Sequence, residues 1–295
     1  MLRLWMTNLR CLWKSAAFWC CAAVTFVLFL TTDVSWGDES TTILAAAFQL
    51  PEETLLSDTV FSSYHIFSSY YSSSFTLFCS MLGIFPFVSF YATQREVGFP
   101  RYELVRTDRR SYPIGQLLSL LCSGVCAVLV GVLLFGIFAY VCFPSIQDYG
   151  TDTVQSELEL LQFQFPWLED FGDLYIVILL RIAGILLYTL CDMSVGILML
   201  TLTRNRYLIL TIPFFFEYLT RRLSVILQAK AYQDTEWNQA IYDLSIYVHA
   251  SATMYFYSYE TKQQVWVLVL HVGFLAICCA LFGIIGNRRV DVGDF

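Results

Sequence analysis

Charged side chains are scarce in this sequence. Asp, Glu, Lys and Arg make up 14% of its 295 residues, against about 25% in soluble domains. Hydrophobic residues account for 57% of the chain, and the mean hydropathy is +0.61. These values exclude an ordinary soluble domain and indicate a protein that lies in a lipid bilayer.

Several motifs of catalysis and metal binding are also missing. The sequence has no G-x-x-x-x-G-K-S/T phosphate loop, so the chain does not hydrolyse ATP by itself. It has neither the H-E-x-x-H spacing of zinc peptidases nor a G-x-S-x-G elbow. Its ten cysteines lie in or beside apolar segments, which excludes a disulfide framework. The histidines are too scattered to share a metal by local spacing: His65, His249 and His271. We therefore predict a chain that is not an enzyme and has no catalytic, cofactor-binding or metal-binding residues.

Long runs without any charged residue are the main positive signal. They cover residues 15–32, 59–94, 111–147 and 263–287. Each reaches the roughly 20 residues that a helix needs to cross about 30 Å of hydrocarbon. Two further apolar segments carry a few charges and are separated by Thr203–Arg206, which suits a tight helical hairpin. We predict an all-α membrane protein with one transmembrane domain, 1–295, and six transmembrane helices at about 15–32, 73–93, 114–142, 174–202, 207–227 and 263–286.

The distribution of basic residues predicts the orientation of these helices. Most Lys and Arg (12 of 17), but only 5 of the 24 Asp and Glu, fall in four segments: 1–14, 94–113, 203–206 and 286–295. Short loops with a Lys/Arg excess stay in the cytoplasm, so both termini are expected there. The first apolar segment has no clear cleavage site and is expected to remain as a helix. The acidic outer loops are then 33–72, 144–173 and 228–262.

The loop 94–113 is the most informative of the basic segments. Pro100 suits the first turn of a helix, and Pro113 suits its end. Tyr102, Val105 and Tyr112 fall near one face of this helix, with the arginines elsewhere. We expect a short amphipathic helix along the cytoplasmic surface. It is either an anchor whose arginines contact anionic lipid headgroups or a docking element for a partner protein.

The residue order in this loop resembles that of type-2 ABC exporter permeases. The matching residues are Glu96-x-Gly98, Leu104-x-Arg106, Asp108-Arg109-Arg110 and Tyr112. The architecture is also similar, with six helices, cytoplasmic termini, a basic segment before helix one and an aromatic-rich outer segment before helix six. In that family the loop between helices two and three is a coupling helix that sits in a groove on a separate ATPase subunit. The resemblance implies that coupling involves Glu96, Gly98, Tyr102, Arg106, Arg109 and Arg110.

The resemblance also implies the partners. Two permease chains, identical or paralogous, would form the pathway for a hydrophobic or amphipathic substrate in a bacterial cytoplasmic membrane. ATP and Mg would bind to the ATPase subunits, so this chain has no cofactor of its own, and no nucleic acid partner is expected. Two rival interpretations are a proton-coupled secondary transporter that uses Asp192 and Glu217, and a membrane sensor or assembly protein that transports nothing.

Three charged residues inside the predicted spans are the candidate pathway residues, because ionisable groups in a bilayer are costly. Asp192 on the fourth helix and Glu217 on the fifth each lie about 15 Å from the cytoplasmic hairpin, so they can share one layer. Arg221 follows Glu217 by four residues, a spacing that permits an ion pair within the helix. This group is either structural or a polar lining of the transport path. Pro213 is expected to kink the fifth helix beside it.

Two further patterns concern packing and the membrane interface. Small residues recur on the third helix, where they permit close approach of another helix within the subunit or in a permease dimer: Ser119, Ser123, Ala127 and Gly131. The outer segment 228–262 is rich in Tyr and Trp, which concentrate at membrane interfaces. We expect one or two helices there, forming an interfacial belt or the lip of a binding site.

Overall fold

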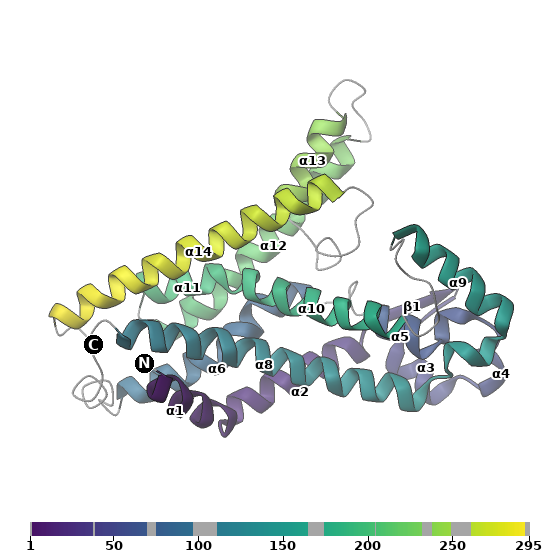
Figure 1. Ribbon diagram of the computed structural model, residues 1–295, viewed down its shortest axis with the longest axis horizontal. Helices are drawn as coiled ribbons and strands as arrows, with labels where there is room; N and C mark the ends of the chain where they lie inside the picture. Colours follow the sequence, from purple (N-terminus) through teal and green to yellow (C-terminus); the bar gives the residue numbers. More distant parts are fainter. Residues whose placement is uncertain are drawn as a thin grey trace.

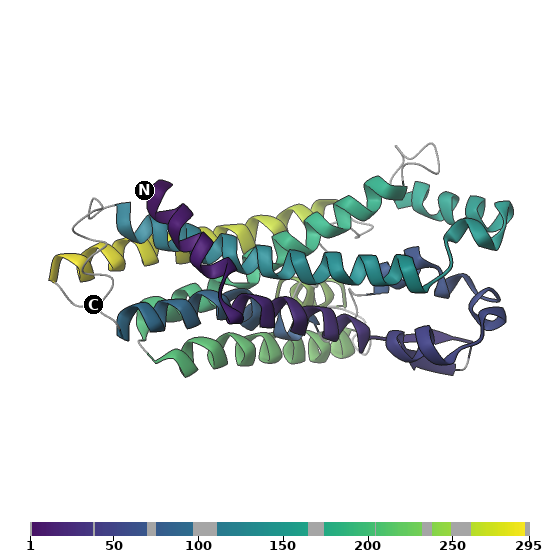
Figure 2. The same cartoon turned by 90° about the horizontal axis from the view of Figure 1, so that it is seen from below.

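Long helices run along the longest axis of the molecule (Figures 1 and 2). The computed structural model describes residues 2–37, 39–69, 75–96, 111–164, 174–203, 205–231, 238–248 and 261–292. The long helices are α2 (Ala16–Leu30), α6 (Phe75–Glu96), α8 (Ser111–Cys142), α10 (Leu174–Asp192), α11 (Ser194–Leu202), α12 (Arg206–Ala231) and α14 (Thr261–Val292). They occupy the six stretches that the sequence predicts as spans, and α10 and α11 share the fourth.

Within the described residues, four helices are long and apolar enough to cross a membrane: Phe75–Gln94, Ser111–Tyr149, Ile176–Leu202 and Val265–Gly286. A fifth candidate is the pair α1 (Leu2–Trp13) and α2, whose helices meet at an angle of 61°. α12 is long enough but carries Glu217, Arg221 and Arg222. The chain therefore has the helices of a membrane-spanning protein, while six spans and cytoplasmic termini remain predictions.

Short elements form a cap at one end of the bundle, on the right in Figure 1. The cap comprises β1 (Asp33–Trp36), β2 (Glu39–Thr42), α3 (Ile43–Gln49), α4 (Glu52–Leu55), η1 (Thr59–Phe61), α5 (Ser63–Ser69), η3 (Ile146–Tyr149) and α9 (Thr151–Gln164). β1 and β2 pair as an antiparallel hairpin, with Val34 opposite Thr41. Gly37, at φ +55°, helps the chain to reverse there. The chain is thus mostly helical, but the all-α prediction is wrong for this hairpin.

Hydrogen bonds between distant residues hold the cap together. The Tyr149 hydroxyl donates to the Leu55 carbonyl at 2.7 Å. The Ser63 N–H donates to the Pro144 carbonyl at 2.8 Å. Because each bond satisfies a polar group that the fold takes out of water, it favours one arrangement of these short elements. The predicted outer loops 33–72 and 144–173 therefore contribute to one folded unit.

The hydrophobic core lies where α2, α6 and α8 pack together. Phe29 is fully buried, and its ring centroid lies 4.9 Å from that of Phe75 and 5.1 Å from that of Phe135. The small-residue stripe of the third helix lies on the buried side of α8. At Gly131, an added Cβ would lie 2.6 Å from Cβ of Thr25 in α2. The stripe therefore serves packing within the chain.

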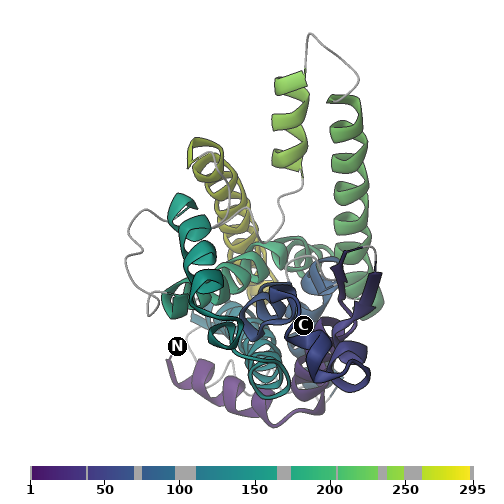
Figure 3. The same cartoon turned by 90° about the vertical axis from the view of Figure 1, so that its right-hand side faces the viewer.

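Three helices project from one side of this core. Figure 3 shows α12 and α13 (Asn238–Val248) side by side, and α13 also contacts α14. α14 contacts α11 and α8 but leaves most of its apolar side chains exposed. α13 lies within the predicted outer segment 228–262, which is therefore partly helical, as expected.

The two chain termini lie at the end of the bundle opposite the cap (Figures 1 and 2). The end of α6, the start of α8 and the connection from α11 to α12 lie at this same end. The described acidic residues of the cap are Asp33, Glu39, Glu52, Glu53, Asp58, Asp148, Asp152, Glu157 and Glu159. The basic and acidic segments of the sequence are thus separated along the bundle axis.

Candidate functional site

The fourth predicted span is interrupted at Met193, between α10 and α11. The Met193 side chain is fully buried at the point where α6 meets α8. An added Cβ at Gly83 would lie 2.6 Å from Met193 Cγ, and one at Gly124 would lie 2.8 Å from Met193 Cε. Any side chain at either glycine would occupy the space that Met193 fills. The interruption is therefore anchored against α6 and α8.

Asp192, the last residue of α10, forms a carboxyl pair with Glu217 of α12. The two side chains are hydrogen-bonded to each other. The Tyr188 hydroxyl donates a second hydrogen bond to Glu217 Oε1 at 3.0 Å. A hydrogen bond between two carboxyl groups needs a proton on one of them, because an ionised carboxylate only accepts. The placement of the pair thus suits a proton shared between α10 and α12.

Polar side chains from α6 and α10 continue this layer. The Cys79 thiol donates to Thr189 Oγ1 at 3.3 Å, and the Thr189 hydroxyl donates to the Ile185 carbonyl at 2.7 Å. Both residues are fully buried. The carboxyl pair is thus one part of a polar layer inside an otherwise apolar bundle, and the layer joins three helices.

A small cavity of about 70 Å³ lies beside the carboxyl pair, and α10, α12 and α14 contribute to its walls. Tyr188, Asp192, Glu217 and His271 line its polar side. Asp192 Oδ2 is buried and has no hydrogen-bond partner among the described residues. The cavity has room for a few water molecules, and it is smaller than the roughly 300 Å³ of a typical ligand pocket. In this conformation the cavity can hold water molecules that exchange protons with the carboxyl pair, but not a larger ligand.

Arg221 lies one turn after Glu217 on α12. Its charge acts on Glu217, but its side chain is exposed. Pro213, one turn before Glu217, is buried, and its ring would lie 3.5 Å from an added Cβ at Gly196 of α11. α12 remains helical on both sides of this proline. The structure thus brings Asp192 and Glu217 together and leaves Arg221 at the edge of their layer.

Most of the predicted coupling residues lie outside the described part of the chain. Gly98, Tyr102, Arg106, Arg109 and Arg110 belong to this group, and so does the coupling helix itself. Glu96 is the last residue of α6. α8 begins at Ser111, earlier than the predicted start at 114, and Pro113 lies in its first turn, where its missing N–H costs no helical hydrogen bond.

Arg181 of α10 is a buried charge whose partner the sequence does not indicate. It is 5% exposed, and its guanidinium carbon lies 4.9 Å from the centroid of the Tyr64 ring in α5. A cation over an aromatic face is attracted by the ring quadrupole. An arginine within an apolar run indicates a charge that needs a partner. The sequence around Tyr64, which lies far away in the chain, does not indicate that Tyr64 is this partner.

The chemistry available to the polar layer is proton exchange and hydrogen bonding. Among the residues described, no group of three or more His, Cys, Asp or Glu side chains is placed to hold a metal ion. The sequence matches no family model, no curated protein and no solved structure. The function is therefore inferred from the layer, the arrangement of the helices and the pattern of the basic loop.

Proposed function

We propose that this chain is the permease subunit of an ABC exporter in a bacterial cytoplasmic membrane. Separate ATPase subunits, with their bound ATP and Mg, drive it from the cytoplasmic side. A second permease chain, identical or paralogous, completes the pathway. The substrate is hydrophobic or amphipathic, and this chain performs no catalysis of its own.

The observation that carries this proposal is the position of the helix ends next to the arginine-rich loop. α6 ends at Glu96 and α8 begins at Ser111, at the end of the bundle that also holds both termini (Figure 2). The acidic cap lies at the opposite end. Because basic segments remain cytoplasmic, this separation supports a loop 94–113 that faces an ATPase below the membrane.

The packing of α6 and α8 supports a route by which ATPase closure reaches the polar layer. An added Cβ at Gly124 of α8 would collide with the carbonyl oxygen of Gly83 in α6. Helices in such close contact move together. Met193 is wedged at the same point, next to Asp192. Movement of the α6–α8 pair is therefore expected to shift the interruption between α10 and α11 and the carboxyl pair beside it.

The test is charge reversal in the loop, with a matched change at the same end of the bundle. Arg106→Glu/Arg109→Glu is expected to reduce co-purification of the ATPase by about tenfold or more, as for loss of an interface anchor worth about 1–4 kcal/mol. Membrane insertion is expected to survive, because Arg95, Arg101 and Arg110 keep the loop inside.

The matched control is Arg288→Glu/Arg289→Glu, which makes the same charge change in the C-terminal segment. It is expected to retain the ATPase. Equal ATPase binding and normal ATP turnover in both double variants would contradict the coupling role and favour a lipid-facing anchor.

A second candidate function is proton-coupled transport. The observation that favours it is the hydrogen-bonded pair of Asp192 and Glu217, which lies beside a cavity suited to water. Intramembrane carboxyl groups are common proton relays. Substrate uptake into inverted vesicles separates the two candidates: an ABC exporter needs ATP without a pH gradient, and a proton-coupled carrier needs the gradient without ATP.

A further inference from the structure

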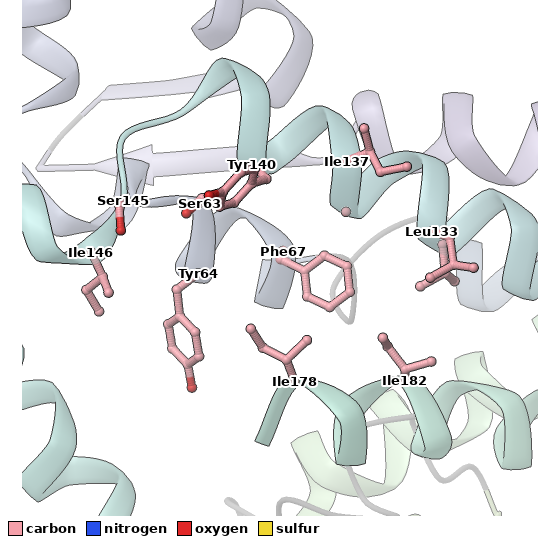
Figure 4. A pocket seen from close by; sticks show the side chains of 12 residues that line it. Ser63, Tyr64, Phe67, Leu133, Ile137, Tyr140, Ser145, Ile146, Ile178 and Ile182 are labelled. Carbon is pink, nitrogen blue, oxygen red and sulfur yellow. The ribbon is translucent and has the colours of Figure 1, made fainter. Parts of the chain in front are cut away.

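A larger cavity lies at the cap end of the bundle, between α5, α8, η3 and α10 (Figure 4). Its volume is about 360 Å³, within the range of about 300–1,000 Å³ found for ligand pockets. Its walls share no residue with the cavity beside Asp192. Most of the lining side chains are aliphatic or aromatic, including Phe67, Val132, Leu133, Ile137, Ile178 and Ile182.

The two ends of this cavity differ in polarity. Ser63, Ser145 and the Tyr140 ring gather at one end, and Leu133 and Ile182 lie at the other (Figure 4). The polar end lies next to the cap. The cavity therefore matches an amphiphile whose apolar part points away from the cap.

The cavity opens onto the apolar outer surface of the bundle. Two of its lining residues on α8, Ile137 and Tyr140, are 63% and 75% exposed. Both belong to a segment that is long and apolar enough to span a membrane, so this surface faces lipid. Water does not fill apolar cavities readily, and an empty cavity forfeits the dispersion contacts of its walls. The hydrocarbon chains of bilayer lipids are the apolar molecules that lie next to this opening and can fill the cavity.

We propose that this cavity holds one acyl chain of a membrane phospholipid, with the headgroup next to the hydroxyls of Ser63 and Ser145. Tyr140 lies at the level of the headgroup, where an apolar ring with a polar tip is favoured.

Arg181 is a positioning residue for this cavity. It lies on α10 between Ile178 and Ile182, which line the cavity, and its guanidinium covers the Tyr64 ring, which is part of the wall. This cation–π contact connects α10 to α5 and holds the wall in place. Arg181→Lys is expected to weaken lipid binding less than Arg181→Ala, because a lysine retains the charge over the ring.

The experiment is photo-crosslinking of the purified full chain in vesicles that contain a phosphatidylcholine with a diazirine at the end of one acyl chain. Peptides that include Leu133–Ile137 and Ile178–Ile182 are expected to be labelled saturably. Leu133→Trp fills the apolar end of the cavity and is expected to abolish this labelling. The matched control is Leu134→Trp, because Leu134 is the next residue, is similarly exposed (43% against 48%) and does not line the cavity.

A second pair of variants guards against a folding defect at Leu133. Gly136→Leu places a side chain inside the cavity, where its Cβ would lie 3.1 Å from the end of the Phe67 ring. Gly273→Leu makes the same change on α14, where nothing lies within 4 Å. Loss of labelling in Leu133→Trp and Gly136→Leu, but not in their controls, supports the site.

Two results would overturn the site: equal labelling in all four variants, or labelling that never saturates and is equal along α14. Either result would mean that lipids only surround the protein. The site does not depend on an ATPase partner, so a failed coupling test leaves it standing, and the reverse also holds.

Discussion

α6 and α14 are both apolar helices of spanning length, yet the protein packs them in opposite ways. Over the most apolar stretch of α6, 56% of the residues are buried inside the molecule; for α14 the share is 6%. α14 is the more hydrophobic of the two, with a mean hydropathy of 2.6 against 1.7 for α6. Hydrophobicity therefore does not decide which helix lies in the core.

The difference is explained by what each helix offers a neighbouring helix. α6 and α8 approach at Gly83 and Gly124, where backbone meets backbone. On α14, an added Cβ at Gly273 or Gly283 would meet nothing within 4 Å. In a bilayer, lipid tails are as apolar as the side chains, so helices associate through close packing and not through removal of apolar surface from water. α14 and the outer face of α12 therefore keep their apolar side chains exposed within this chain.

The largest expected effect in this comparison comes from aromatic truncation. Phe29→Ala is expected to lower the free energy of unfolding by about 3–5 kcal/mol, because it leaves a cavity between Phe75 and Phe135. Phe215→Ala on α12 removes the same atoms from a side chain that is 55% exposed, and a change below about 0.5 kcal/mol is expected. Unfolding of the purified variants in mild detergent measures both. Equal losses would show that the exposed face of α12 is also packed.

An intermediate effect is expected from leucine at two glycines. Gly124→Leu forces a side chain against the Gly83 carbonyl and is expected to cost about 1–3 kcal/mol or more. Gly283→Leu, on the open side of α14, is expected to be nearly neutral. The midpoint of thermal unfolding in detergent compares the two. If Gly283→Leu instead weakens association of two copies, α14 is an interface and not only a lipid-facing helix.

An effect of similar or smaller size is expected at the polar layer, where α10 meets α12. Glu217→Ala removes the acceptor of the Tyr188 hydroxyl and the partner of Asp192, at a cost of about 1–3 kcal/mol. Glu217→Gln keeps an acceptor and a donor and is expected to cost less. Adding Arg221→Ala to Glu217→Ala should change little, because Arg221 is exposed. Stability recovered in that double variant would instead identify the ion pair as the dominant interaction.

The sequence predicted the helical stretches well. A helix that crosses hydrocarbon needs a continuous run of about 20 apolar residues, and such a run can be read directly along the chain. Charge-free runs located α2, α6, α8 and α14. The constant rise of a helix also indicated that Asp192 and Glu217 lie at one depth, and the structure joins them by a hydrogen bond. The same rule did not reveal the hairpin of β1 and β2, whose short strands have no long apolar run.

Contacts between residues that are distant in the chain could not be predicted from the sequence. Nothing in the chain links Arg181 to Tyr64, or Met193 to Gly83 and Gly124, because each contact depends on which helices lie side by side. The small residues of α8 illustrate this limit. Their spacing suited packing within the subunit and in a dimer equally well, and the structure shows them buried within the chain.

The sequence by itself determined which segments form long apolar helices and how charge is divided along the chain, because both follow from the cost of placing charge in hydrocarbon. Only the tertiary structure decided which apolar faces meet, where the carboxyl pair is enclosed and where an apolar cavity opens at the surface of the bundle. The physical reason is that an apolar side chain is nearly as stable against a lipid tail as against another helix, so the fit of surfaces makes that choice.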